Sequence, residues 1–582
     1  MWLLFGCCGV WVGVAVVDDD ANVADKRSGD ISASEFFNNF DAPLSSIDVT
    51  ETKVTKAIDK IKADSAPGTD RLTAVFLKKC RDEITPFLTL LMNQSLLSGE
   101  IPDILKEAVV IPIYKGGDSY LPKNYRPVLL TSHLIKLMER VIHTDLVQYL
   151  DEHFLFNSNQ HGFRAGRSTI SELLQHHHNI VDALECGQDI DILMLDYSKA
   201  FDSVQHTLLL KKLKSIGVDG KLGLWIANFL KSRLQRVKVG SSFSSLAEVL
   251  SGVPQGTILG PILFLIFIAD ISDKVSSNLS SYADDTKLSR AIENGGDRVA
   301  LQSDLSEVFN WSESNSLKFN VDKLELLRIN GSKRLDDSHY YIGPLGSPIP
   351  QVETSKDLGI IFNKNGSFKD HIEGKCSKAR QICGYILRTF ITRDSGVMLT
   401  LFKSLVLPIL EYGCILWNPF KLSEIRCLEQ VQHNFTSRIE LNDELNYWDR
   451  LKKFKLYSLE RRRERYIILY VFKIIKGIVP NPGISWKVHE RRGLELCYPP
   501  IKGGGKEKHK KMKHQSFFVK SVRLFNCLPK RIRSIGNSVD MLTIKYHLDE
   551  FLADCPDEPR LQGYTVASRS VNNELTNQAM LL

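Results

Sequence analysis

The chain lacks the cysteine spacing of a zinc-binding module. It has 11 cysteines in 582 residues, and no two of them stand in a Cys-x2-Cys arrangement. Such pairs mark zinc knuckles, and regularly spaced cysteines mark a disulfide framework. We therefore expect no zinc module, no disulfide framework, and the reduced thiols of an intracellular protein.

Long apolar runs are also scarce. Residues 1–17 are apolar, but this stretch is short for a membrane span, which takes about 20 residues. It also lacks the basic start and the small-residue cleavage site of a secretory signal. We expect a start site inside unrelated flanking sequence here, and neither secretion nor membrane anchoring. A signal peptide or anchor is the less favoured alternative.

Neither sign of charge dominates. The 75 Lys and Arg residues stand against 68 Asp and Glu residues, which gives a formal net charge of +7, and 43% of the residues are hydrophobic. A chain of this length and hydrophobic content can bury a large core, and it predicts more than one domain. The mildly basic balance is compatible with a nucleic-acid partner but does not identify one.

Two adjacent carboxylates, Asp284 and Asp285, stand between short segments of strand-like composition. This pattern predicts a tight hairpin with the acids at its tip. Adjacent carboxylates repel each other, and solvent or a divalent cation removes that cost. A polar turn between two strands is the alternative, and it is the better interpretation of an Asp-Asp pair that stands alone.

A third acid stands in an equally specific setting upstream. Residues 192–195 are apolar and lie between Asp191 and Asp196, which predicts a buried strand with Asp196 at its C-terminal edge. The long interval before Asp284 leaves room for a helical crossover between strands of one sheet. If those strands are neighbours, Asp196 and Asp284 converge, together with Asp285. Such oxygen ligands can hold two hard cations for phosphoryl transfer.

These two acidic segments carry a resemblance to a known family. Residues 195–202 read LDYSKAFD and residues 282–285 read YADD, and they resemble motifs A and C of reverse transcriptases. The amino-acid sequence of these motifs is similar to that of non-LTR retrotransposons, specifically jockey-like and chicken-repeat-like elements. The resemblance implies an RNA-directed DNA polymerase that adds dNMPs to a primer 3′-OH by two-metal catalysis. The implied cofactor is Mg²⁺, with Mn²⁺ as an alternative, bound by Asp196, Asp284 and Asp285.

Further segments stand in the order that this family requires. Residues 108–118 and 124–132 resemble the fingers hairpin and motif 1. The resemblance implies that Lys115 and Arg126 grip the incoming triphosphate, as cations can. Taken singly, each is better interpreted as a solvated surface charge, and only the motif context favours a role in binding.

The resemblance also assigns residues around the nucleotide. Phe201 resembles the steric gate that occupies the space of a ribose 2′-OH, which implies a deoxynucleotide substrate. Residues 251–261 match motif B closely, and they imply that Gln255 and Gly256 contact the nucleotide. A lone phenylalanine would instead be interpreted as part of the core.

Four residues are implied to act on the nucleic acid or the leaving group. Arg164 and Arg167 lie in a Gly- and Arg-rich loop that resembles motif 2, although His161 stands where many relatives have Phe. Gly359 lies in a segment that resembles the primer-grip hairpin. Lys323 matches the motif D lysine proposed to protonate the leaving pyrophosphate, and a surface charge is the alternative.

Three other features do not point to one interpretation. The run at residues 176–178 is three histidines, for which we favour a solvated or core-edge helix face over a metal site. The basic helix at residues 456–465 and the Gly- and Lys-rich loop at 502–513 would bind phosphate or would be solvated charge runs, and the sequence favours neither.

The resemblance covers residues 34–565 and implies an α+β fold, the right-hand polymerase with fingers, palm and thumb. We expect an antiparallel palm sheet, a helical thumb and a mostly helical C-terminal region. The predicted divisions are residues 1–33 as an apolar and disordered N-terminal segment, 34–92 as a helical segment ahead of the fingers, 93–363 as fingers and palm, 364–440 as thumb, and 441–582 as a basic helical C-terminal region with a disordered tail.

The implied partners are an RNA template, a DNA primer or target, and dNTPs, with no stable membrane partner. A ribonucleoprotein with the element's RNA is expected in nucleus and cytoplasm. Relatives usually carry an endonuclease ahead of the polymerase, and we expect none here. An RNA-dependent RNA polymerase is a rival, but it would usually show Gly-Asp-Asp and no aromatic gate. An inactive or co-opted remnant that binds RNA is the alternative from another class.

Overall fold

The computed structural model describes residues 43–329, 339–343, 346–439, 445–500, 507–535, 539–558 and 573–579. The predicted N-terminal segment, residues 1–33, lies outside these ranges. Contacts divide the chain into two compact units. The first unit takes the chain up to Phe163 together with Asp196–Val275 and Glu307–Asn320, and the second takes Arg164–Leu195, Ser276–Ser306 and Val321–Leu582. The linear divisions predicted from sequence stay predictions.

The first unit consists of helices around a mixed sheet of strand order β2-β1-β4-β5, with β6 also paired to β4. β1 is antiparallel to β2 and parallel to β4. The strands are β1 (Glu107–Tyr114), β2 (Tyr125–Leu130), β4 (Arg233–Val239), β5 (Ser242–Phe243) and β6 (Ala247–Val249). The α-helices are α1 (Glu51–Asp59), α2 (Ala74–Lys79), α3 (Arg81–Ser98), α4 (His133–Glu152), α6 (His206–Ser215), α7 (Gly220–Leu230) and α8 (Leu259–Phe267). The predicted fingers hairpin is therefore present as β1 and β2.

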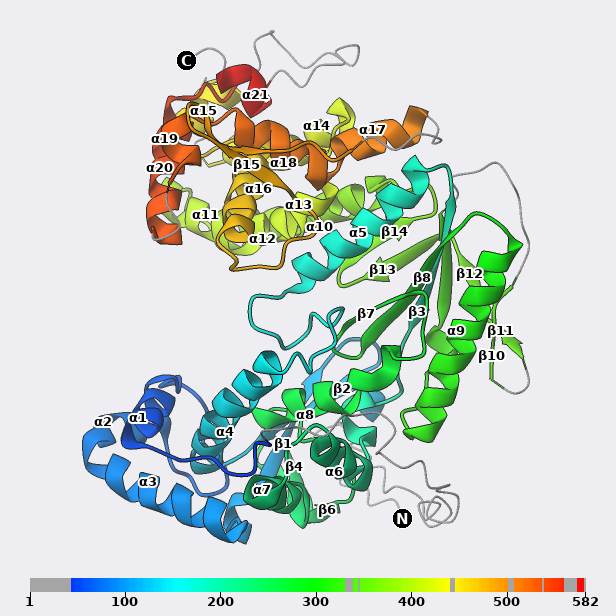
Figure 1. Ribbon diagram of the computed structural model, residues 1–582. Coiled ribbons are helices and arrows are strands. Elements are labelled where there is room, and N and C mark those ends of the chain that lie inside the picture. The colour runs from blue at the N-terminus through cyan, green and yellow to red at the C-terminus, as the bar shows by residue number, and fades with distance from the viewer. Residues whose placement is uncertain are drawn as a thin grey trace. The chain divides into compact units, whose positions relative to one another are not determined.

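The second unit is built on an antiparallel sheet extended by one parallel strand. Its order is β12-β9-β3-β8-β7, and β3 lies in the middle, antiparallel to both β8 and β9. β12 is parallel to β9. Figure 1 shows β3, β8 and β7 side by side. The strands are β3 (Asp189–Leu195), β7 (Asn278–Tyr282), β8 (Asp285–Ile292), β9 (Glu325–Ile329) and β12 (Gln351–Val352).

Two more hairpins and the remaining helices complete this unit. The hairpins are β13 (Thr354–Asp357) with β14 (Ile360–Asn363) and β15 (Trp486–His489) with β16 (Gly493–Leu496), and β10 (Tyr341–Ile342) pairs with β11 (Ser347–Pro348). The helices are α5 (Thr169–Glu185), α10 (Lys369–Thr389), α11 (Ser395–Leu401), α12 (Leu407–Glu411), α13 (Cys414–Trp417), α14 (Leu422–Thr436), α15 (Tyr447–Lys453), α16 (Leu459–Ile475), α17 (Glu507–Gln515), α18 (Phe517–Asn526), α19 (Lys530–Arg533), α20 (Met541–Asp554) and α21 (Leu575–Gln578). A further helix, α9 (Gly295–Ser314), begins in this unit and ends in the first. The α+β class and the antiparallel sheet predicted from sequence are confirmed.

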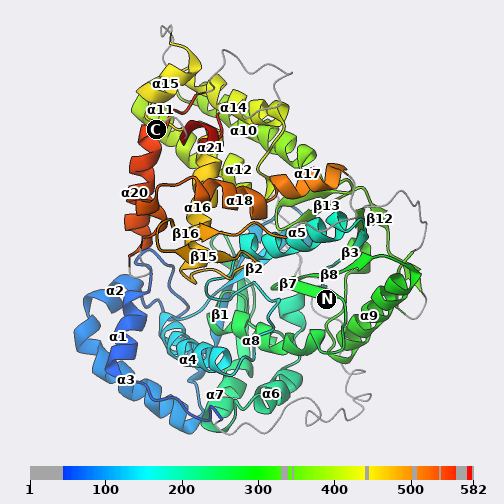
Figure 2. The same ribbon diagram turned by 45° about the horizontal axis from the view of Figure 1, so that its top comes forward.

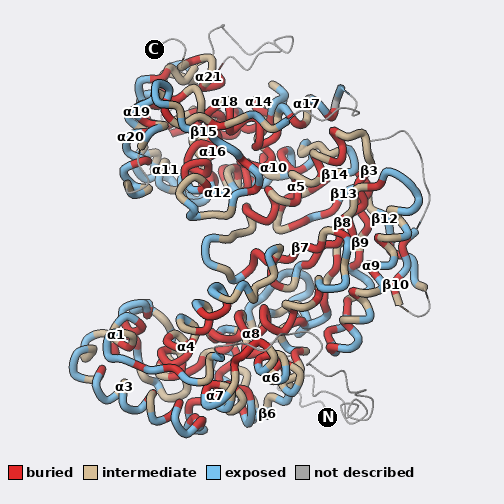
Figure 3. Tube along the Cα trace, in the orientation of Figure 1, coloured by how far each residue is buried: buried red, intermediate tan, exposed pale blue. Residues whose placement is uncertain are grey.

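The central strand β3 is buried on both faces, as the apolar run predicted (Figure 3). Ile190 and Ile192 belong to one large core with Leu173 of α5. Asp191 points to the opposite face because side chains alternate along a strand. It is fully buried, and Arg328 of β9 donates to it from Nε at 2.9 Å and from Nη2 at 3.1 Å. The hydroxyl of Tyr340 donates to the same carboxylate at 2.7 Å.

The basic helix predicted at residues 456–465 does not expose its charges. Arg461 and Arg463 of α16 are buried, with 0% and 1% exposure. Arg462 pairs with Glu411, and Arg465 pairs with Asp549. Both sequence interpretations, phosphate binding and a solvated charge run, are therefore wrong for this helix. Its acidic partners lie far away in the sequence, where local pattern cannot find them.

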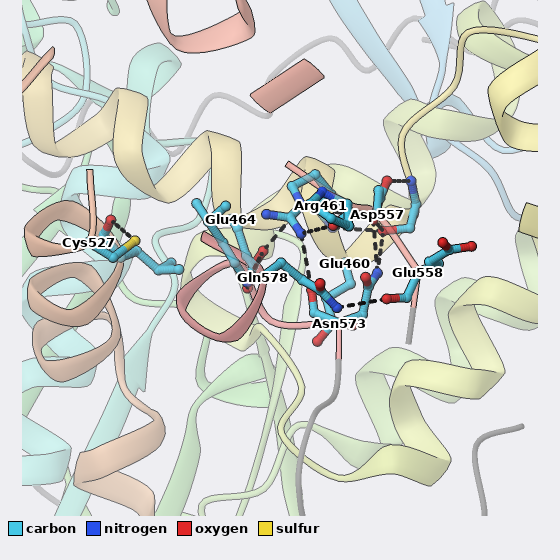
Figure 4. Close-up of polar contacts among 12 residues, drawn as sticks. Glu460, Arg461, Glu464, Cys527, Asp557, Glu558, Asn573 and Gln578 are labelled. Atoms are coloured by element: carbon cyan, nitrogen blue, oxygen red, sulfur yellow. Dashed lines mark hydrogen bonds and ion pairs between the residues drawn. The ribbon is translucent and has the colours of Figure 1, made fainter. Parts of the chain in front are cut away.

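Arg461 lies at the centre of a buried polar cluster (Figure 4). Its Nη2 donates to the main-chain oxygens of Pro556 at 3.1 Å and Asn573 at 3.3 Å. The side chain of Asn573 donates to Asp557 at 2.9 Å.

Figure 2 shows α16 between α18 and α20. The chain after Pro556 is thus part of the core at residues 573–579, where Leu575 is fully buried, and the predicted disorder is wrong for these residues.

The histidine run lies on a helix face that packs on the core. His176 and His177 of α5 are buried, and their rings contact Phe362 and Phe368. Of the two favoured interpretations, the core-edge face agrees with the structure and the solvated face does not. The predicted loop at 502–513 is helical from Glu507 onward as part of α17, and its earlier residues lie outside the described ranges.

In the described part of the chain, no helix is both long and apolar enough to cross a membrane.

Acid should weaken this fold through its buried histidines. Burial lowers the pKa of His177 and of His371 to about 4, whereas an unfolded histidine has a pKa near 6.5. Between these values the unfolded chain binds more protons, so stability is complete above about pH 6.5 and falls as the pH drops toward 4, by up to about 3 kcal/mol per histidine.

A substitution at His371 can remove the titrating group and keep the hydrogen bond that its ring accepts. Its Nδ1 accepts the main-chain N–H of Ile361 at 3.2 Å, and an asparagine can keep that acceptor without titrating. We expect the urea midpoint of His371→Asn to fall less between pH 6.5 and 4.5 than the wild-type midpoint. Equal falls for the two proteins would contradict this assignment.

Candidate active site

Asp284 lies in the two-residue turn of the β7–β8 hairpin, and Asp285 begins β8. Tyr282 and Asp285 are the last paired residues, which leaves Ala283 and Asp284 as the turn. Ala283 has φ +61°, a left-handed conformation that normally favours glycine. A strained non-glycine residue persists only where its surroundings fix it, and such strain gathers at functional sites. The predicted hairpin with acids at its tip is confirmed.

Strand β8 also pairs with β3, so the neighbourhood that the sequence argument required is confirmed. The antiparallel register runs from Asp189 opposite Ile292 to Leu195 opposite Thr286. β3 ends at Leu195, and Asp196 is the next residue of the chain.

Within the first unit, the backbone around Asp196 is held by residues 318–320. The main-chain oxygen of Asp196 accepts the N–H of Asn320 at 2.8 Å, and Ser198 donates to Lys318 at 2.8 Å. The ring of Tyr197 stacks on Phe319 with centroids 4.6 Å apart. The Asp196 side chain is half-buried. Lys323, the predicted proton donor, is exposed in a short 3₁₀ turn of the second unit (Val321–Lys323).

The structure brings Phe201, Gln255 and Gly256 of the first unit together. Phe201 is half-buried and stacks on Phe264 of α8 with centroids 4.5 Å apart. Its main-chain oxygen accepts the N–H of Val253 at 2.8 Å. Gln255 donates from Nε2 to Asp202 at 2.9 Å. Motifs A and B are therefore joined through both backbone and side chains.

Gly256 is required by a close approach to β2. It has φ +103°, and a Cβ there would lie 2.8 Å from the main-chain oxygen of Leu129. Leu129 in turn donates its N–H to the oxygen of Gln255 at 3.0 Å. Arg126 lies on β2 and Lys115 directly follows β1, and both are exposed. The fingers hairpin and motif B thus share one backbone junction.

A buried acid that the sequence argument missed supports this junction. Glu139 of α4 is fully buried, and its Oε2 accepts the N–H groups of Ile258 at 2.7 Å and Leu259 at 3.0 Å, at the start of α8. Burial raises the pKa of Glu139, and these two N–H groups and Arg233 oppose the rise. The one available signal was a charged residue between the apolar neighbours Leu137 and Val141.

In the second unit, Arg164 and Arg167 are half-buried in the loop before α5. Between them, Gly166 has φ +72°, and a Cβ there would lie 2.7 Å from the oxygen of Ile478. This glycine is therefore required by protein packing. Gly359 stands in the β13–β14 turn with φ +86°.

The donors that would hold a metal are carboxylates, the ligands that Mg²⁺ prefers. Within the described ranges, no group of three or more His, Cys, Asp or Glu side chains is arranged to hold an ion. Mg²⁺ does not need such a cage, because it is usually bound by one or two carboxylates together with water and substrate phosphates. Adjacent Asp284 and Asp285 at the end of the paired β7–β8 hairpin fit that requirement.

Residues 113–362 match the family model described as "Reverse transcriptase (RNA-dependent DNA polymerase)". They form a reverse transcriptase domain. Every site residue predicted from sequence, from Lys115 to Gly359, lies inside this reverse transcriptase domain. The resemblance to non-LTR retrotransposon enzymes is confirmed.

The domain and its flanks are similar to curated proteins of Drosophila melanogaster. "Probable RNA-directed DNA polymerase from transposon BS" is 28% identical over 67% of this chain. "RNA-directed DNA polymerase from mobile element jockey" is 28% identical over 68% of it, and the protein named for transposon X-element is 26% identical over 68%. The match covers 44% of the length of each relative. The chain therefore spans less than half of these relatives.

Loss of Glu139 should loosen the reverse transcriptase domain at the start of α8. Glu139→Ala leaves two main-chain N–H groups without their acceptor and removes the negative charge near the buried Arg233. It should lower the free energy of unfolding by about 3 kcal/mol. Glu139→Gln keeps an acceptor oxygen and should cost about 1 kcal/mol. Urea unfolding measures both. Glu152→Ala, at the exposed end of the same helix, is the control, and a similar loss in all three variants would contradict the assignment.

Proposed function

We propose that the chain is an RNA-directed DNA polymerase. It adds a deoxynucleoside monophosphate to a primer 3′-OH on an RNA template and releases pyrophosphate. The observation that carries this proposal is the β3–β8 register, in which Leu195 lies opposite Thr286. Asp196 follows Leu195 directly, and Asp284 and Asp285 directly precede Thr286. In an antiparallel pair these positions belong to the same end of the two strands, which supports convergence of the three carboxylates.

Asp196, Asp284 and Asp285 would hold the catalytic Mg²⁺, with Mn²⁺ as an alternative. Bound divalent metal supplies charge neutralisation at the triphosphate and acidifies the attacking hydroxyl. The protein's part is to hold the carboxylates in place. The β7–β8 turn fixes Asp284 and Asp285, and the main-chain bond from Asn320 fixes the backbone of Asp196.

Residues of the first unit would select and orient the nucleotide. The Phe201 ring, backed by Phe264, would occupy the space of a ribose 2′-OH. A packed aromatic pair yields little, because protein interiors are dense. Gln255 and Gly256 would contact the nucleotide, and the exposed Lys115 and Arg126 would bind its phosphates.

Other residues would handle the nucleic acid. Arg164 and Arg167 would bind backbone phosphate, and Gly359 would let the β13–β14 turn approach the primer. Lys323 is exposed, as a proton donor to the leaving pyrophosphate would have to be. The partners would be RNA template, DNA primer or target, and dNTPs. A ribonucleoprotein with the element RNA would occur in nucleus and cytoplasm.

Asp284→Asn should separate chemistry from binding. A carboxylate that positions catalytic metal is worth several kcal/mol in the transition state, so primer extension should fall by roughly a thousandfold. RNA retention should remain largely intact, because retention depends on cationic side chains. The assay is extension of oligo(dT) on poly(rA) with dTTP and Mg²⁺, beside filter binding of the RNA. Equal loss of both would contradict the metal role, and a folded, RNA-binding but inactive wild type would favour a remnant that binds RNA.

Phe201→Ala should weaken discrimination against ribonucleotides. Removal of the ring opens the space that a 2′-OH needs, and the ratio of kcat/KM for UTP to that for dTTP should rise by roughly tenfold or more. Single-nucleotide extension with each substrate measures the ratio. Phe201→Tyr, which keeps the ring, is the matched control and should retain wild-type discrimination. An unchanged ratio in Phe201→Ala would refute the gate.

A further inference from the structure

A buried lysine on β8 connects three elements of the second unit. Lys287 stands two residues after Asp285, and its side chain is 3% exposed. Its Nζ forms ion pairs with Glu172 in the first turn of α5 and with Asp357 at the end of β13. The side chains of Glu172 and Asp357 are 0% and 5% exposed.

The β13–β14 hairpin needs such a connection. Its two strands pair with each other and form a separate sheet, so they do not extend the main-chain ladder of the central sheet. Side chains provide the polar connections from β13 to that sheet. Asp357 binds Lys287 of β8 at 2.5 Å, and Ser355 donates to Glu325 of β9 at 2.7 Å.

The turn of this hairpin is also held from α5 and α12. Tyr412, next to the end of α12, donates its hydroxyl to the main-chain oxygen of Leu358 at 2.7 Å and lies 3.2 Å from the hydroxyl of Thr169. A Cβ at Gly359 would lie 3.3 Å from the Tyr412 ring. Both ribbon views place α5 beside β13 (Figures 1 and 2). The turn and the start of α5 therefore share one network.

A buried ion pair has a geometric consequence that a surface pair lacks. Each charge must stay with its partner, because separation would leave an unpaired charge in the interior. The attachment of Lys287 to Asp357 therefore sets one position of the hairpin relative to β8. A fourth element, β7, joins this network through Ser280, whose Oγ donates to Glu172 at 3.2 Å.

We propose that Lys287 is a positioning residue for polymerisation: its pairing with Asp357 fixes the β13–β14 hairpin, and thereby the primer terminus, relative to the β7–β8 hairpin that carries Asp284 and Asp285. This inference rests on the proposed polymerase function. Lys287 itself contacts neither substrate nor metal. Its effect is on where the primer end lies, and a small misplacement of reacting groups is costly in rate.

Asp357 is the best residue to change because it lies away from the catalytic acids in sequence. Asp357→Ala removes the attachment and leaves Lys287 paired with Glu172, so the interior keeps a balanced pair. Asp357→Asn keeps an oxygen that Lys287 can donate to. Asp370→Ala is the matched control, since Asp370 is an exposed acid that accepts from Asn363 at the end of the same hairpin.

The test is steady-state primer extension on poly(rA)/oligo(dT), with separate KM values for primer–template and for dTTP. Asp357→Ala should raise the KM for primer–template by about tenfold, since the hairpin no longer holds one position. The KM for dTTP should stay near the wild-type value. Asp357→Asn should recover much of the loss, and Asp370→Ala should behave as wild type. Fluorescence anisotropy with labelled primer–template should show the same order of affinities.

Each other outcome has one meaning. If the wild type is active and Asp357→Ala has the wild-type KM for primer–template, the positioning role is overturned. A lower kcat in both Asp357 variants with both KM values unchanged shows a merely structural pair and also overturns it. A folded wild type that neither extends nor binds primer–template refutes the proposed polymerase function, and this inference with it.

Discussion

The pairing of β3 with β8 determines how the candidate site is assembled. Side chains alternate along a strand, so one register decides which residues enter the core and which chain segments meet at the strand ends. Here the register ends with Leu195 opposite Thr286. Asp196 follows the one strand, and the Ala283–Asp284 turn precedes the other. A slip by one residue would exchange Ile192, a core residue, with Asp191 and would break the pairing of Asp191 with Arg328.

Buried charge connects elements of the second unit at several places. Asp191 binds Arg328 across the β3–β9 pair, Lys287 binds acids on α5 and β13, and Arg461 binds main-chain oxygens near the C-terminal end of the described chain. Such groups add little net stability over apolar residues of the same size, but breaking one partner leaves a costly buried charge. Their effect is therefore on specificity, since only one arrangement of the elements satisfies all of them.

Local features of the chain were predictable from sequence. The β7–β8 hairpin, the buried strand β3 and the fingers hairpin follow from short apolar runs and turn residues, and the order of the motifs indicated the reverse transcriptase domain. The polar partners were not predictable. Lys287 and Asp357, Glu139 and Ile258, and Arg461 and Asn573 are far apart in sequence, and periodicity says whether a position is buried but not which charge meets it. For that reason the arginines of α16 were wrongly assigned to solvent or phosphate.

The most direct measurement is metal-directed cleavage of the chain, because it reports the carboxylates without requiring activity. Fe²⁺ bound in place of Mg²⁺ generates short-lived radicals with ascorbate and peroxide, and these cut the backbone near the ion. We expect cuts near both Asp196 and Asp284 in the wild-type chain, suppressed by excess Mg²⁺ and lost in Asp284→Asn. Cleavage near only one of the two acids, or cleavage that Asp284→Asn leaves unchanged, would contradict a shared metal site.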